Sequence, residues 1–300
     1  MTAGKSTLRL AGGTPLWQAA RHLLVRRGKE YVACCTATLG SFGLDEIHDF
    51  RVSSRRLREA LSLFAPCYDR VAMQNCSRDV RKVTRRLGAV RNLDESFLFF
   101  AALTEKLDMS HRLALTPFLM SREAARAPLL AQLERFLGEQ RPERFLERHR
   151  RQFSSPSLVN GPGGIDLFMT LREFAETAMK EGHEGLLTLV APARSVEDDE
   201  ARHRLRIALK HYRYRFELFE PLADDLYGGV YRLIKQYQET LGSLNDLTLF
   251  CDLVTGGLVP PPFVQGVRVA IERQKELLMK ELFRLLDRKP LDTVSFPFGE

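Results

Sequence analysis

One segment of the chain reads His48-Asp-Phe-Arg51-Val-Ser-Ser-Arg55-Arg56-Leu-Arg58, and a second reads His203-Arg204-Leu-Arg206-Ile-Ala-Leu-Lys210-His211-Tyr-Arg213. On an α-helix, each histidine and the cations three, seven and ten residues after it lie within about 80° of one another. The opposite side of the helix carries apolar residues, which are Phe50, Leu57, Leu61 and Phe64 in the first segment and Leu205, Tyr212, Phe216 and Phe219 in the second. Each segment therefore predicts a helix with one cationic face and one face in the core.

The composition is that of a soluble globular chain, with 44% hydrophobic and 28% charged residues among 300, so a folded protein is expected. The net charge of +7 favours a polyanionic partner. The chain has no apolar run of about 18 residues, and Met1 to Thr14 lacks a signal-peptide core, which together predict a cytoplasmic protein with no membrane partner. The cysteines lack C-x-x-C spacing and a histidine cluster, so we expect mostly buried, reduced thiols, no metal site and no cofactor: Cys34, Cys35, Cys67, Cys76 and Cys251.

Helical periodicity predominates and no segment alternates convincingly like a strand, which predicts an all-α fold. Helices are expected over residues 15–39, 46–64, 69–88, 92–106, 110–121, 123–138, 142–152, 166–190, 197–220, 224–242, 245–255 and 262–287. Residues 154–164 are rich in serine, proline and glycine and form the predicted linker. The expected divisions are an N-terminal extension (1–14), a first half (15–153), this linker, a second half (165–287) and a C-terminal tail (288–300).

The two halves share more than the basic helix. Each basic segment ends on Phe-x-Pro, and each following helix ends in related sequence, Leu87-Gly88-Ala89-Val90-Arg91-Asn92-Leu93 and Leu241-Gly242-Ser243-Leu244-Asn245-Asp246-Leu247. The offset from His48 to His203 is 155 residues, and from Gly88 to Gly242 it is 154. This spacing indicates a duplicated bundle. Each glycine is expected to end its helix in a left-handed conformation, and Asn92, Asn245 or Asp246 to cap the next helix.

A second cationic stripe is predicted on the helix that leads to the first glycine. Arg78, Arg81, Lys82 and Arg85 share one face of that helix. The matching helix of the second half keeps Arg232 and Lys235, but has Gln236 and Glu239 in place of Lys82 and Arg85. We therefore expect the first half to bind anions more strongly than the second.

These motifs resemble the CHAD domain family, the conserved histidine α-helical domain. The family's first half has the pattern His-x-x-Arg-Val-x-x-Arg-Arg-Leu-Arg, then Arg-Arg-Leu-Gly-x-x-Arg-Asp-Leu-Asp, from which only Asn92 departs by replacing an aspartate. The second half has His-x-x-Arg-Ile-x-x-Lys-x-x-Arg-Tyr, then Leu-Gly-x-Leu-Asn-Asp, which His203 to Tyr214 and Leu241 to Asp246 reproduce. The resemblance covers residues 15 to 287.

The resemblance implies an all-α fold of two pseudo-symmetric, duplicated helical bundles that form one CHAD unit with a basic central cavity. It further implies binding of inorganic polyphosphate, association with polyphosphate granules and no catalysis, so no catalytic residue is expected. Arginine suits this ligand because its guanidinium grips phosphate oxygens bidentately and stays charged. The predicted ligand residues are His48, Arg51, Arg55, Arg56, Arg58, Arg78, Arg81, Lys82, Arg85, His203, Arg206, Lys210, Arg213 and Lys235.

Other interpretations stay open at this stage, as does the oligomeric state. His48 and His203 could cap or orient helices instead of touching ligand. The chain could be a general polyanion binder or bind RNA or single-stranded nucleic acid, although most aromatic residues of the second basic segment lie on its apolar side. A phosphoanhydride hydrolase ranks third, because no separate acid-base set accompanies either histidine. Basic clusters outside the repeat, such as Arg144, Arg148 and Arg151, are expected to be surface charge.

Overall fold

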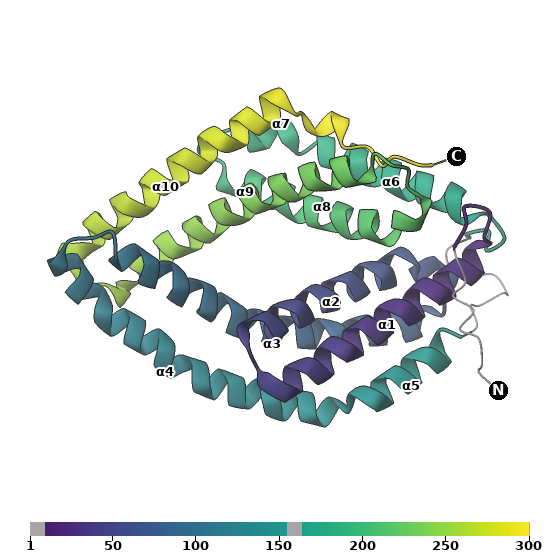
Figure 1. The fold of residues 1–300 in the computed structure, drawn as a ribbon, viewed down its shortest axis with the longest axis horizontal. Helices are drawn as coiled ribbons and strands as arrows, with labels where there is room; N and C mark the ends of the chain where they lie inside the picture. Colours follow the sequence, from purple (N-terminus) through teal and green to yellow (C-terminus); the bar gives the residue numbers. More distant parts are fainter. Residues whose placement is uncertain (1–9, 155–163, 300) are drawn as a thin grey trace.

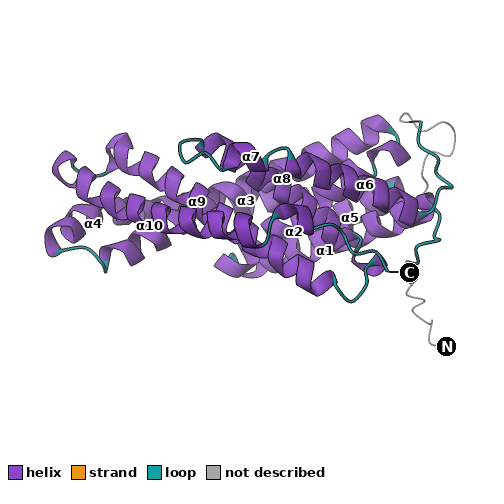
Figure 2. Cartoon of the chain, turned by 90° about the horizontal axis from the view of Figure 1, so that it is seen from above, coloured by secondary structure: helices purple, strands orange, loops and turns teal. Residues whose placement is uncertain are grey.

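A computed structural model describes residues 10–154 and 164–299 of the chain. The regular elements in these two ranges are helices, with two isolated β-bridges in addition (Figure 2). The all-α prediction is therefore confirmed. Before residue 155 the elements are α1 (Leu16–Ser41), α2 (Leu44–Leu63), the 3-10 turn η1 (Ala65–Cys67), α3 (Arg70–Thr104), α4 (Met109–Gln140) and α5 (Pro142–Gln152).

After residue 163 the same order of helix, 3-10 turn and helix recurs. The elements are α6 (Leu171–Leu187), α7 (Val190–Ala193), α8 (Asp199–Leu218), the 3-10 turn η2 (Glu220–Leu222), α9 (Tyr227–Leu253), the π-helical turn η3 (Val254–Leu258), α10 (Pro261–Arg288) and the 3-10 turn η4 (Leu291–Thr293). Helices α1 to α5 lie on one side of the molecule and α6 to α10 on the other (Figure 1). The two basic segments form α2 and α8, which pack against each other between the two sides.

Two of the predicted helix breaks are wrong. Helix α3 runs through Gly88 and α9 runs through Gly242, so neither glycine ends a helix and Asn92, Asn245 and Asp246 cap none. Continuity costs little here because both helices keep burying apolar residues beyond the glycine. Gly88 faces α2: a Cβ at this position would make an ordinary van der Waals contact, 3.6 Å, with Nε of Arg51.

Two further expected boundaries also differ from the structure. Helix α4 is continuous across the break expected at residue 122, and it includes Pro117 and Pro128. The single helix expected over 166–190 is α6 followed by the short α7, and Thr170 caps α6 through a capping box with Glu173.

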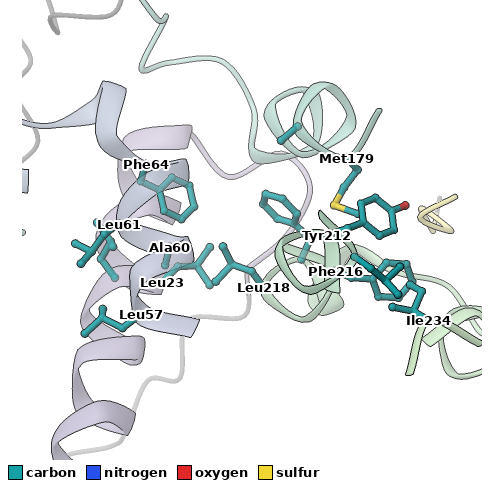
Figure 3. Close-up of a cluster of buried hydrophobic side chains, with 14 of the residues drawn as sticks. Leu23, Leu57, Ala60, Leu61, Phe64, Met179, Tyr212, Phe216, Leu218 and Ile234 are labelled. Carbon is teal, nitrogen blue, oxygen red and sulfur yellow. The ribbon is translucent and has the colours of Figure 1, made fainter. Parts of the chain in front are cut away.

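The hydrophobic core is not divided at the linker. One cluster of buried side chains extends from Leu23 of α1 and Ala60 of α2 to Leu218 and Phe216 of α8 and Ile234 of α9 (Figure 3). A smaller cluster joins the end of α3 and the start of α4 to the end of α9 and the start of α10. The two sides of the molecule are therefore held together by shared apolar burial at both ends, with the basic segments in between.

Backbone hydrogen bonds also pair the two segments that precede α1 and α6. These bonds join Leu16 N to Met169 O (2.9 Å), Leu171 N to Thr14 O (2.8 Å), Trp17 N to Leu167 O (3.1 Å) and Arg172 N to Gly12 O (3.0 Å). The four bonds form two pairs, the first with the second and the third with the fourth. Within each pair the donor's number rises by 155 and the acceptor's number falls by 155, which is the offset that separates His48 from His203. This reciprocal pairing supports the duplication hypothesis, which stays a prediction.

The predicted domain boundaries also stay predictions. Most of the expected extension (1–14) and linker (154–164) falls on residues 1–9 and 155–163, outside the described residues. All five cysteines are free thiols, of which Cys35, Cys67 and Cys76 are buried. Within residues 10–154 and 164–299, no helix is both long enough and apolar enough to cross a membrane.

Candidate anion-binding groove

Local sequence explains why both basic segments form helices. Asp45 and Glu46 lie in the first turn of α2, where negative charge stabilises the helix dipole. On α8, the side chain of Asp198 caps the helix by accepting a hydrogen bond from the backbone of Ala201. Neither His48 nor His203 is a cap residue. Of the alternative in which the two histidines cap or orient helices, the capping part is therefore wrong for both, whereas the part in which they orient helices stays open.

Two adjoining cavities lie along α2 and α8, and we call them together the cationic groove. The larger has a volume of about 640 Å³ and the smaller about 450 Å³. Arg55 of α2 and Arg206, Lys210 and Tyr214 of α8 line both cavities. The two basic faces predicted from the sequence therefore meet, and the shared residues mark the place where the cavities join.

Most of the predicted ligand residues lie in this groove. The larger cavity is lined by His48, Arg51, Arg55, Arg56, Arg206, Lys210, Arg213 and Lys235. The smaller cavity adds Arg58 and His203. The stripe predicted on α3 lies apart: Arg78, Arg81, Lys82 and Arg85 are exposed and line neither cavity. Ser77 is the residue of that region of α3 which does line the groove.

Arg81 is the member of the α3 stripe whose charge acts on the pKa of a groove residue, Arg58. Burial lowers the pKa of Arg58, and the charge of Arg81 lowers it further. Ser77, one turn before Arg81, faces the smaller cavity. The α3 stripe therefore extends positive charge outward from the edge of the groove.

Four cations of the groove have no acidic partner. Within residues 10–154 and 164–299, no Asp or Glu oxygen lies within 4.0 Å of Arg51, Arg55, Arg58 or Lys210. The Nε atoms of Arg51, Arg58 and Arg206 are buried and make no hydrogen bond to any described group. Arg206 comes no closer than 4.0 Å to Asp246. Buried donors without acceptors cost free energy, which a bound anion would recover.

The pKa values record the same accumulation of charge. Burial lowers the pKa of Lys210 from 10.5 to about 6, and the charges of Arg206, Arg55 and Arg51 contribute. Burial and the charge of Arg55 lower the pKa of Arg51 to about 10. Like charges and desolvation both disfavour the charged forms. The cations of the groove thus repel one another, as expected for a site that binds an anion.

Two of the predicted ligand cations share one carboxylate, that of Glu217 on α8. Nε of Arg56 on α2 lies 2.6 Å from Glu217, which joins the two halves, and Nη1 of Arg213 on α8 itself lies 3.1 Å from the same carboxylate. The hydroxyl of Tyr231 also donates a hydrogen bond to Glu217, at 2.8 Å. Arg56 and Arg213 face the groove but are not free in it. The sequence gives no sign of this pairing, because Glu217 is 161 residues from Arg56.

A second buried carboxylate makes the corresponding contact from α2 to α8. Glu59 accepts hydrogen bonds from Nε of Arg215, at 2.7 Å, and from Nδ1 of His211. Burial acts to raise the pKa of Glu59, but the bonds from His211 and Arg215 outweigh it and lower the pKa. Glu59 looks like an ordinary surface acid in the sequence. With Glu217 it ties α2 to α8, and Glu59 and His211 both line the smaller cavity of the groove.

The two histidines differ in their surroundings. Nδ1 of His203 donates to Oδ1 of Asn245 on α9, at 2.6 Å, so this side chain links two helices. His48 is exposed at the edge of the larger cavity. Partial burial and then the charge of Arg91 lower the pKa of His48. Near pH 7 the imidazole of His48 is therefore uncharged in the free protein.

The larger cavity also has an acidic end, which the sequence did not indicate. Glu95 of α3 and Asp246 of α9 line it there, and Arg91 pairs with Glu95 at 2.9 Å. Burial raises the pKa of Asp246, and the neighbouring Glu95 adds to the effect. Asp246 lies 4.0 Å from Arg206 and acts on the pKa of Lys210, whereas neither Glu95 nor Asp246 lines the smaller cavity. An anion is therefore expected to bind where the cavities join.

This fold is that of a CHAD domain. The CHAD domain family model matches residues 36–255, and the chain belongs to that family. The family is associated with polyphosphate-related proteins. No curated protein gives a significant match to the sequence.

Two solved structures are similar to the chain. The CHAD domain from the plant Ricinus communis aligns with a TM-score of 0.60 and 22% identity, over 98% of this chain and 95% of the plant domain. PptA from Streptomyces chartreusis aligns with a TM-score of 0.69 and 15% identity, over 92% of this chain and all of PptA. At these identities the similarity extends to the fold alone.

Proposed function

We propose that this protein binds inorganic polyphosphate in the cationic groove, without catalysis, and that binding brings it to polyphosphate granules. The observation that carries the proposal is the meeting of cations from both halves: Arg51, Arg55 and Lys210 have no carboxylate oxygen within 4.0 Å in the described residues, and Arg206 has only Asp246, at 4.0 Å. Polyphosphate carries about one negative charge per phosphate along a flexible chain. Such a ligand can lie along the groove and offer each cation a phosphoryl oxygen in turn.

The aromatic residues favour polyphosphate over nucleic acid. Proteins that hold single strands stack the bases on exposed aromatic rings. Tyr212 and Phe216 of α8 are instead buried in the core, with at most 1% of each residue exposed. Tyr214 and Tyr231 line the groove, but Tyr231 is bonded to Glu217. A ligand without bases therefore fits this groove better than RNA or single-stranded DNA.

Support for a binding role without catalysis comes from the histidines and carboxylates. A histidine nucleophile for phosphoryl transfer needs a free ring nitrogen and an acid placed to protonate the leaving oxygen. Nδ1 of His203 donates to Asn245, which leaves Nε2 free, but neither His203 nor His48 has a carboxylate within hydrogen-bonding distance in the described structure. Glu59, which lines the smaller cavity, and Glu217 are both engaged by arginines.

The proposal is tested by competition between polymers of matched total charge at physiological salt. Labelled long-chain polyphosphate is bound first, and unlabelled polyphosphate, RNA or single-stranded DNA is then added. We expect polyphosphate to displace the label at more than about tenfold lower phosphate concentration than either nucleic acid, because stacking contributes nothing here. Equal displacement by all three polymers would contradict the proposal and indicate a general polyanion surface.

Polyphosphate affinity is expected to fall as the pH rises from 6 to 8. Lys210 has a pKa of about 6 in the free protein, and an adjacent polyanion raises that pKa in the complex. The gain in polyphosphate affinity from protonated Lys210 is therefore complete below pH 6. It is lost as the pH rises through the higher pKa that Lys210 has in the complex. The decline is at most about tenfold per pH unit for one proton taken up.

Calorimetry in buffers of different ionisation enthalpy measures this proton uptake directly. Other titratable groups also line the groove, so the control must isolate the lysine: His48, His203, His211, Asp49, Glu59, Glu95, Glu239 and Asp246. Lys210→Arg keeps the charge but does not titrate in this range, and it should remove about one proton from the uptake near pH 7.5. An unchanged uptake in this variant would assign the pH dependence to another group.

A further inference from the structure

Lys210 occupies an unusual position for a lysine. It lies where the two cavities join, and it lines both of them. The charges that act on it come from Arg206 on its own helix and from Arg55 and Arg51 on α2. The one carboxylate with a detectable influence is Asp246 of α9. The side chain is half-buried, so a small molecule that enters either cavity can reach it.

This environment leaves Lys210 largely as a free amine near neutral pH. Burial and the three guanidinium groups lower its pKa to about 6. An ordinary lysine with a pKa near 10.4 has only about 0.1% free amine at pH 7.5. The unprotonated amine is the nucleophilic form, and desolvation next to other cations is a recognised way of producing it.

We propose that Lys210 is a covalent modification site for acyl phosphates, which the cationic groove binds through their phosphate group. The proposal rests on the proposed function, because the cations that would hold polyphosphate also hold the reagent. With the phosphate on Arg55 and Arg206, Nζ of Lys210 attacks the carbonyl carbon. The N–C bond forms, the C–O bond to phosphate breaks, inorganic phosphate leaves and the amine proton passes to phosphate or water.

Bound phosphate does not abolish the nucleophile. The charges of Arg51, Arg55 and Arg206 all lower the pKa of Lys210. One small phosphate dianion offsets only part of their combined effect on that pKa. A long polyphosphate chain brings more negative charge into the groove. It covers the amine of Lys210 and raises the pKa of that amine, so that the amine is protonated. The reagent and the polymer therefore compete for one site, and the polymer should protect Lys210 from acylation.

Acylation also changes the site in a defined way. The product is a neutral amide, so the groove loses one positive charge and gains an acyl group at the junction of its two cavities. Polyphosphate binding should weaken by about tenfold, the loss expected for one charge-assisted contact. Exposure to acyl phosphates would thus reduce polyphosphate binding by the same protein.

The test compares the rates at which lysines react. The intact protein is incubated with acetyl phosphate at pH 7.5, and acetylation of each lysine is followed by mass spectrometry. Lys210 is expected to react at least about tenfold faster than Lys280, an exposed lysine of α10 outside the groove. Its rate should level off above pH 7, whereas that of Lys280 should keep rising toward pH 10. Long-chain polyphosphate should suppress the reaction at Lys210 alone.

A second reagent separates the two proposals. The N-hydroxysuccinimide ester of acetic acid acylates amines but has no phosphate, so it reports the free amine alone. Preference for Lys210 over Lys280 should be larger with acetyl phosphate than with this ester. If polyphosphate binds tightly but acetyl phosphate shows no preference for Lys210, the modification site is overturned and the proposed function stands. If the preference is equal for both reagents, the groove does not hold the phosphate group and the modification proposal is overturned.

The Lys210→Arg variant provides the matched control for the consequence of acylation. It keeps a positive charge in the groove and has no amine to acylate. Acetyl phosphate should lower polyphosphate binding by the original protein and leave binding by this variant unchanged. An equal loss in both proteins would place the responsible acylation elsewhere and overturn the assignment to Lys210.

Discussion

Replacing Arg55, Arg206 and Lys210 together with alanine is expected to weaken polyphosphate binding by on the order of a thousandfold at low salt. These three cations line both cavities and come from both halves. Each charge-assisted hydrogen bond to phosphate contributes about 1.5–3 kcal/mol, and non-additivity brings the total nearer 4 kcal/mol. Titration of a labelled polyphosphate at several salt concentrations measures the loss. The slope of log affinity against log salt should fall by about two.

The matched control removes the same charge from another place. Arg144, Arg148 and Arg151 lie exposed on α5, where Arg148 pairs with Asp79 and Arg151 with Glu147. Alanine at all three positions should change affinity by less than about threefold, because exposed, paired charges contribute little. Equal losses in the two triple variants would mean that affinity comes from diffuse charge and not from the groove. The groove variant should also be at least as stable as the original, because it relieves repulsion among buried cations.

Periodicity was sufficient to predict the walls of the groove. The apolar residues on one side of each basic segment, such as Phe50 and Tyr212, are buried as expected. Their burial orients the cations on the opposite side, and α2 and α8 turn those sides toward a common space. The pattern could not predict which cations stay unpaired, because a partner such as Glu217 comes from a distant part of the chain. Arg55 and Arg56 are adjacent in sequence, yet only Arg56 is paired.

The helix boundaries were the weaker part of the prediction, for a physical reason. Glycine often ends a helix, but its intrinsic cost inside one is only about 1 kcal/mol. Burial of Leu87 and Val90 on either side of Gly88 outweighs that cost. Gly88 faces Arg51 of α2, where a Cβ would make only an ordinary van der Waals contact. A residue interpreted as a break thus lies inside a continuous helix, next to a groove cation.

Changing Glu59 to glutamine is expected to lower the free energy of unfolding by about 3 kcal/mol near pH 7. Only 4% of the Glu59 side chain is exposed, and it accepts bonds from both Arg215 and His211 of the opposite half. Glutamine keeps the shape but removes the charge that these two donors face. Urea unfolding at several pH values provides the measurement. The apolar contacts between α2 and α8 remain, so the variant should still fold.

The acid dependence distinguishes this interaction from simple loss of packing. The folded-state pKa of Glu59 lies below the 4.5 of an ordinary glutamate. Its stabilising effect is therefore complete above pH 4.5 and is lost as the pH falls through the lower, folded-state value. The original protein and Glu59→Gln should thus differ most near pH 7 and converge in acid. Glu200→Gln on α8, where the carboxylate is 72% exposed and 4.0 Å from Arg204, should cost less than about 0.5 kcal/mol. A constant difference between the original protein and Glu59→Gln at every pH would mean that the loss comes from how the amide hydrogen-bonds at this position, and not from the charge of Glu59.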